Sequence, residues 1–175
     1  DFSVERAVVE RVEVTGPSTA AAGASVGFSG DVIAADGRLV ESSLAWTVSP
    51  PSAGTIDAET GQLTCEPDYI GELAVTARDP GSGLSGRLPV SVYAIVNATT
   101  EATFRDSLGM QLEIQPGAVS ETKNVYLSHE SLPDVKKFGK SFTVECDAFH
   151  LKPDGLRFSS ESEPTLTLPR VSGDS

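Results

Sequence analysis

The stretch that decides the fold is LAWTVSPPSAGTIDAETGQLTCEPDYIGELAVTARD, residues 44–79. At its start, Leu44, Trp46 and Val48 alternate with polar or small residues, and a double proline follows. At its end, GELAVTARD (71–79) repeats the alternation. Side chains two positions apart share one face of a strand, so both segments are predicted to be strands with one buried face.

The middle of this stretch predicts a hairpin. GTIDAETGQLTCEP (54–67) has two short strand-like runs around Glu59-Thr60-Gly61. Gly61 supplies the positive φ that such a turn needs, because glycine has no Cβ. Asp57 is placed to cap the turn through its carboxylate.

The same alternation extends in both directions from this stretch. Strands are expected within 7–16, within 23–37 up to the Asp36-Gly37 turn, and at 87–96 after a flexible turn at 80–86. Together they make about seven short strands with polar turns between them, which is typical of a small β-sandwich. No segment has a convincing helical period.

A second β-rich run follows the polar link 97–102. The chain is therefore predicted to be all-β, with one sandwich at 1–96, a linker at 97–102 and a second sandwich at 103–175. The second segment is short for a domain, which leaves open whether it is complete.

Composition limits the classes of function. The formal net charge is -12 in 175 residues, which disfavours binding to nucleic acid and to anionic membranes. No apolar run approaches the roughly 20 residues that span a bilayer. The chain begins at Asp1, which fits either a processed mature protein or a trimmed piece. A soluble extracellular or cell-surface protein is expected.

The two cysteines, Cys65 and Cys146, lie in different predicted domains. Neither has a second cysteine two or three positions away, so a zinc knuckle or a redox C-x-x-C motif is excluded. Two buried thiols are expected, and a disulfide between the domains stays an alternative.

The first part resembles a bacterial immunoglobulin-like domain, from Ala7 to Val96. The resemblance is carried by a tryptophan strand, an Ile-Asp-x-x-Thr-Gly turn and a Gly-x-x-x-Val-x-Ala strand. The matching residues are Trp46, Ile56, Asp57, Thr60, Gly61, Gly71, Val75 and Ala77. The resemblance implies an immunoglobulin-like β-sandwich of a bacterial adhesin or cell-surface protein.

The second part is similar to a ZU-five domain, from Thr103 to Pro169. The motifs are LEIQPGAVSETKNVYLS (112–128) and FHLKPDGLRFSSESEPTLTLP (149–169). The matching residues are Ile114, Pro116, Gly117, Ala118, Pro153, Gly155, Phe158, Pro164, Leu166, Leu168 and Pro169. Some members of that family cleave themselves at His-Phe-Ser or His-Phe-Thr. His129 and His150 are followed by other residues, so self-cleavage within this chain is not expected.

Candidate catalytic and metal sites are few. In AFHLKPDGLRF (148–158), His150 is predicted to lie on a strand and Asp154 in a turn, without a catalytic role. The match to G-x-S-x-G at GASVG (23–27) is interpreted as turn composition, so no hydrolase site is expected. No cofactor is expected. Calcium stays an alternative, through residues such as Asp31, Asp36 and Asp79 in predicted loops or at the domain junction.

The one local excess of positive charge is LPDVKKFGKSF (132–142). Lys136, Lys137, Phe138 and Lys140 make a candidate contact patch for an acidic polymer or an acidic neighbouring domain. A solvated hairpin, in which the lysines discourage pairing at a sheet edge, explains the same residues. The sequon Asn97-Ala98-Thr99 is interpreted as a chance match.

The expected function is a non-catalytic, extracellular structural or adhesive module whose partner is a protein or a cell-surface polymer. An alternative is an accessory region of a larger secreted enzyme whose catalytic domain lies outside this sequence. A carbohydrate-binding module is a further alternative; it needs exposed aromatic rings, and Tyr69, Tyr93 and Tyr126 are the candidates because Trp46 is expected in the core.

Overall fold

The computed structural model describes residues 8–130, 148–152, 158–159 and 161–168. The described part of the chain is built from β-strands, with one short 3₁₀-helix, η1 (Pro51–Ala53). The prediction of an all-β fold is confirmed. None of the described helical structure has the length and apolar character needed to cross a bilayer.

Ten strands precede residue 97 and five follow it in the described residues. In chain order they are β1 (Val9–Thr15), β2 (Thr19–Ala21), β3 (Ser25–Gly27), β4 (Ser29–Ala34), β5 (Leu39–Val40), β6 (Ala45–Ser49), β7 (Gly54–Ile56), β8 (Gln62–Cys65), β9 (Gly71–Arg78), β10 (Ser85–Val96), β11 (Ala102–Arg105), β12 (Gln111–Ile114), β13 (Lys123–Glu130), β14 (Ala148–Lys152) and β15 (Thr165–Thr167).

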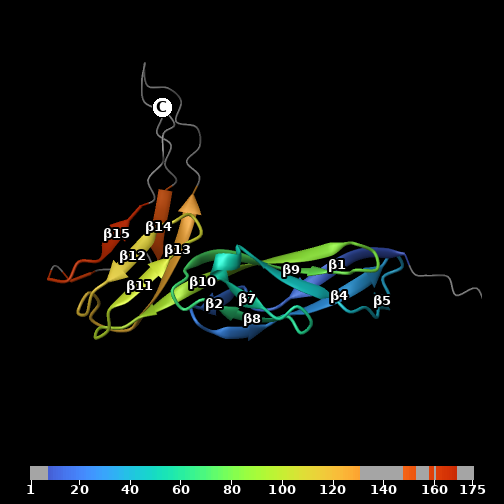
Figure 1. The fold of residues 1–175 in the computed structure, drawn as a ribbon, viewed down its shortest axis with the longest axis horizontal. Coiled ribbons are helices and arrows are strands. Elements are labelled where there is room, and N and C mark those ends of the chain that lie inside the picture. The colour runs from blue at the N-terminus through green and yellow to red at the C-terminus, as the bar shows by residue number, and fades with distance from the viewer. Residues whose placement is uncertain (1–7, 131–147, 153–157, 160, 169–175) are drawn as a thin grey trace, which may run out of the picture.

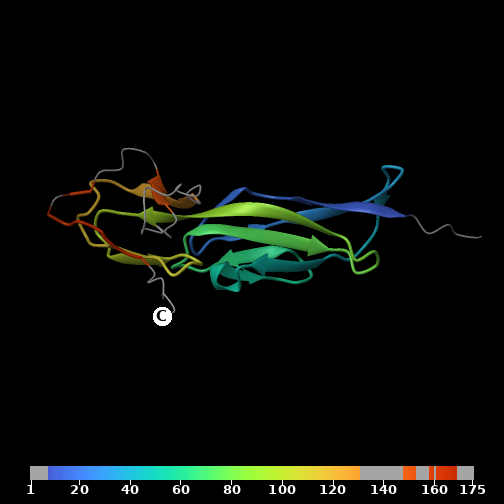
Figure 2. The same cartoon turned by 90° about the horizontal axis from the view of Figure 1, so that it is seen from above.

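The strands form four sheets. A six-stranded sheet has the order β14-β13-β10-β9-β6, with β2 added in parallel to β10. The other three sheets have three strands each: β1-β4-β5, β3-β8-β7 and β11-β12-β15. Figure 1 shows an elongated molecule with β11, β12 and β15 toward one end and β1, β4 and β5 toward the other, and Figure 2 shows the same elongation from above.

Two separate hydrophobic cores lie along this length. The first core gathers buried side chains from β1, β4, β6, β8, β9 and the first half of β10, with Trp46 among them. The second core gathers side chains from the end of β10 and from β11, β12 and β13, including Leu112 and Ile114. We call the strands around these cores the first unit and the second unit.

The hairpin in the deciding stretch is confirmed. Strands β7 and β8 pair antiparallel, and Gly61 has a φ of 72°. The Asp57 Oδ1 atom accepts hydrogen bonds from the backbone N–H groups of Glu59 and Thr60, at 3.0 and 2.7 Å. These bonds hold the pKa of Asp57 below its usual value.

One predicted strand is two strands in the structure. Residues 23–37 were expected to hold a single strand, but the chain changes sheets at Phe28. Strand β3 pairs with β8, whereas β4 pairs with β1 and β5. Phe28 is buried in the first core at the change of sheet, and alternation alone does not mark such a change.

Candidate functional site

The two cores meet along one continuous strand. Strand β10 has 12 residues; its first eight pair with β9 and its last three with β13. Val90 and Val92 belong to the first core, while Ala94 and Val96 belong to the second. These residues alternate on one face of the strand, so both cores pack against the same face of β10.

A second connection joins the units through the segment between β8 and β9. Ile70 is fully buried, and it belongs to the second core although it immediately precedes β9 of the first unit. Its backbone N–H donates to the carbonyl of Arg105 at 2.9 Å, and the N–H of Arg105 donates to the carbonyl of Asp68 at 2.6 Å. Main-chain hydrogen bonds therefore tie the first unit to β11.

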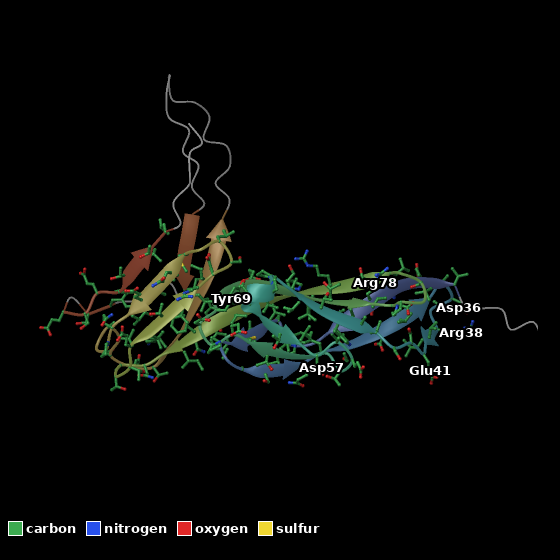
Figure 3. All side chains as sticks on the ribbon, in the orientation of Figure 1. Asp36, Arg38, Glu41, Asp57, Tyr69 and Arg78 are labelled. Atoms are coloured by element: carbon green, nitrogen blue, oxygen red, sulfur yellow. The ribbon has the colours of Figure 1, made fainter. Side chains whose placement is uncertain are left out.

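Tyr69 lies at this junction (Figure 3) and is only 2% exposed. Its hydroxyl donates to the carbonyl of Glu72 at 2.7 Å, which satisfies the polar end of a buried ring. Burial raises the pKa of Tyr69. Tyr69 was one of three candidate rings for carbohydrate binding, and its burial in the first core removes it from that set.

The β11–β12 turn at the same junction is held by a buried carboxylate. Asp106 is 8% exposed, and its Oδ1 accepts the N–H groups of Leu108 and Met110, at 2.9 and 2.7 Å. The Met110 side chain is fully buried in the second core. The turn is thereby fixed where β11 meets the first unit. The predicted division into 1–96, 97–102 and 103–175 stays a prediction, although Ile70, Ala94 and Val96 pack in the second core.

The other two tyrosines lie side by side on the sheet. Tyr93 on β10 and Tyr126 on β13 have ring centroids 5.0 Å apart, with the ring planes tilted by 37°. Both rings are half-buried. Lys152 is registered opposite Tyr126, and Ile95, on the same face as Tyr93, is 53% exposed. This tyrosine pair is a half-buried aromatic surface that the sequence alone did not predict.

A small pocket of mixed character lies at the end of the first unit that faces away from the second (Figure 1). It has a volume of about 320 Å³ and is lined by Val9, Val40, Glu41, Ser42, Asp79, Gly81 and Ser82. Figure 3 shows Asp36, Arg38 and Glu41 near this end. The pocket contains one buried acid, Asp79, which is 3% exposed.

Asp79 is engaged by its own loop and by the segment before β6. The Ser42 hydroxyl donates to its Oδ1 at 2.5 Å, and the Ser82 hydroxyl and N–H donate to its Oδ2 at 2.6 and 2.8 Å. These hydrogen bonds hold the pKa of Asp79 well below its usual range, with Ser42 the largest cause. Asp79 therefore acts as an anionic tie between two loops.

A second pocket, of about 520 Å³, opens beside the Trp46 ring. Phe28, Gly30, Leu44 and Thr60 are among the residues that line it. Trp46 itself is 6% exposed and packs in the first core, so its burial, predicted from alternation, is confirmed.

The predicted calcium ligands are not gathered into one site. The Asp36 carboxylate accepts hydrogen bonds from Arg38, Asp31 lies on β4 opposite Glu13, and Asp79 is held by serines. Within the described ranges, no three His, Cys, Asp or Glu side chains are arranged to hold a metal ion.

Several predicted residues lie outside the described residues. These are the contact patch Lys136, Lys137, Phe138 and Lys140, together with Cys146 and Asp154. His150 lies on β14, opposite Ser128, so the predicted strand is confirmed there. Cys65 is a free thiol, 2% exposed, and burial raises its pKa.

Comparison with known proteins gives one weak structural likeness to report. No family model matches the chain, and no curated protein matches it in sequence. Among solved structures, it is similar to surface layer protein SbsC, domains 1–6, with 12% identity and a TM-score of 0.43. The alignment covers 95% of this chain and 26% of that one, so the chain spans about a quarter of that protein's length. The resemblances to immunoglobulin-like and ZU-five domains stay predictions.

Proposed function

We propose that this protein is a non-catalytic, extracellular spacer in which two β-sandwiches are fixed end to end. The observation that carries the proposal is β10, because a hinge between the units needs a flexible connection and here one strand serves both cores. Bending at this point would break strand pairing or expose Ala94 and Val96, so the junction resists it.

The course of the chain supports a spacer. The first described strand, β1, starts at one end of the long axis, and β14 and β15 lie at the other end (Figure 1). A chain that enters at one end and leaves at the other keeps whatever it joins at a set separation. The junction adds the Ile70–Arg105 and Arg105–Asp68 main-chain bonds to the shared strand.

Extracellular location and the domain families belong to the same proposal. The acidic composition suits a soluble surface protein. The order proposed is an immunoglobulin-like domain followed by a ZU-five-like domain, with a protein or surface polymer as partner. The buried acid Asp79 supports a non-catalytic role, because its oxygens are already bonded to serines and backbone N–H groups.

The rigidity of the junction can be tested by measuring distances between two spin labels, each attached to an unnatural side chain, in two doubly labelled proteins. One pair joins Arg38 to Glu121 across the junction, and the control pair joins Arg38 to Glu59 within the first unit. Each label replaces an exposed side chain, and the surface ion pairs that are lost contribute little to stability. We expect distance distributions of equal width. A distribution that is broad only across the junction contradicts the spacer.

A second candidate function is carbohydrate binding by the tyrosine pair. Tyr93 and Tyr126 bring two half-buried rings together on one sheet face, and aromatic faces suit the apolar faces of sugar rings. The test is a glycan panel with Tyr93→Ala and Tyr126→Ala, and with Tyr93→Phe as the control that keeps the ring. Binding lost in both alanine variants and kept in the phenylalanine variant supports this function. An absence of binding by the unaltered protein removes it.

A further inference from the structure

The chain segment that enters the first unit is held between two other strands. Strand β1 pairs antiparallel with β4 over six registered residue pairs. The next strand, β2, pairs in parallel with β10, with Thr19 opposite Ser91 and Ala21 opposite Tyr93. Residues 9–15 are therefore attached to β4, and residues 19–21 to β10.

Strand β1 also packs closely against β10. A Cβ atom on Gly86 of β10 would collide with the carbonyl oxygen of Val12 and would come within 3.2 Å of the Val14 side chain. Gly86 is the residue that allows the two backbones to approach. Two further main-chain bonds fix β2: Ser91 N–H donates to the Ser18 carbonyl at 2.9 Å, and Ala22 N–H donates to the Tyr93 carbonyl at 2.8 Å.

The direction of these strands decides how they respond to tension. Strands β2 and β10 run the same way, and the chain enters before β1 and leaves after β10. Tension between these two points pulls β2 and β10 in opposite directions along their common axis. Hydrogen bonds that lie across that axis must then give way together, whereas an antiparallel hairpin pulled from its two open ends separates one bond at a time.

We propose that β1, β2 and β10 form a load-bearing clamp, so that the first unit transmits tension along the molecule. This inference rests on the proposed spacer function and adds mechanical resistance to it. The residues that carry it are the paired backbones at Thr19–Ser91 and Ala21–Tyr93 and the Ala22–Tyr93 bond.

The test is a force-clamp measurement on the full chain. One handle is attached at the amino terminus, and the other at the exposed residue Glu101 through an unnatural side chain. The load then enters at β1 and leaves through the end of β10, which also pairs with β13. The released length shows whether the first unit has opened, because about 3.5 Å is gained per residue extended.

Two matched proline variants probe the clamp. Ala22→Pro removes the N–H bond from β2 to β10. Ala24→Pro removes a bond of similar length, from Ala24 N–H to the Ala21 carbonyl, which is a local turn bond after β2 and does not join β2 to β10. One lost hydrogen bond in the clamp shortens the lifetime under load about fivefold. We expect this in Ala22→Pro and no change in Ala24→Pro. Equal lifetimes in the two variants overturn the clamp.

A cross-link gives a second measurement that does not depend on a proline variant folding. Thr19→Cys with Ser91→Cys places two thiols on registered residues of β2 and β10. Oxidation is expected to abolish the opening step of the first unit, and reduction to restore it. An unchanged opening step in the oxidised form overturns the proposal. The two proposals can fail separately. If the force measurements support the clamp but the spin labels show that the junction bends, the spacer function is refuted and the clamp is retained.

Discussion

Ile70→Ala tests whether the two cores are energetically distinct. Ile70 is fully buried and packs in the second core, although the strand that follows it belongs to the first. Truncating a buried isoleucine to alanine costs about 2–5 kcal/mol. A loss of about 3 kcal/mol lowers amide protection in the affected unit roughly 150-fold, provided that the unit opens separately from the rest of the molecule. We expect this loss at Val125 and Leu127 of the second unit.

The assay is native-state hydrogen exchange, with Leu73→Ala as the matched control. Leu73 is 3% exposed and lies three residues further along, but it packs in the first core. The single tryptophan, Trp46, reports on the first core by fluorescence. Unchanged protection at Val125 and Leu127 in Ile70→Ala refutes the assignment of Ile70 to the second core. An equal loss in Leu73→Ala refutes separate opening of the two units.

Three further predictions concern the first unit. Gly61→Ala is expected to destabilise it by about 1–3 kcal/mol in urea unfolding, because φ is 72° and a Cβ would lie 2.9 Å from Trp46; an unchanged midpoint contradicts this. The pKa of the Asp79 carboxyl is lower in the folded protein than in the unfolded chain, where it is near 4. The ionised carboxylate therefore stabilises the folded protein above that pH, and this stability is lost as the pH falls. Between about pH 5 and 3, the urea midpoint should therefore fall less in Asp79→Asn than in the unaltered protein. The same dependence of the midpoint on pH in both proteins would argue against this. Cys65, with its buried thiol and raised pKa, should react with iodoacetamide only after unfolding, as peptide mass spectrometry can show; labelling of the native protein at the rate of a free thiol would count against it.

Local patterns predicted local structure well. Alternation placed Trp46 in the core, and the residue types at Asp57 and Gly61 predicted both the turn and its cap. These features depend on neighbours within a few positions. The break at Phe28 was missed because the pattern of apolar residues does not say which sheet a strand joins.

The junction was not predicted, because it depends on contacts between residues that lie far apart in the sequence. Ile70 was out of phase with the alternation of Leu73 and the strand that follows, which was a usable signal that it faces elsewhere. The pairing of Tyr93 with Tyr126 had no local signal, because it requires the register of β10 against β13. Tyr69 was misjudged because composition does not show that a backbone carbonyl will satisfy its hydroxyl.

Strand β10 also limits how this protein can be divided or recombined. A gene boundary after Val96 looks natural by sequence, yet it would remove Ala94 and Val96, and with them a pairing strand, from the second unit. A fragment starting at residue 97 would expose one side of Val125, which Ala94 covers by register. Replacing one unit by another module would therefore leave the remaining unit without its part of β10, so the two units have to be moved together.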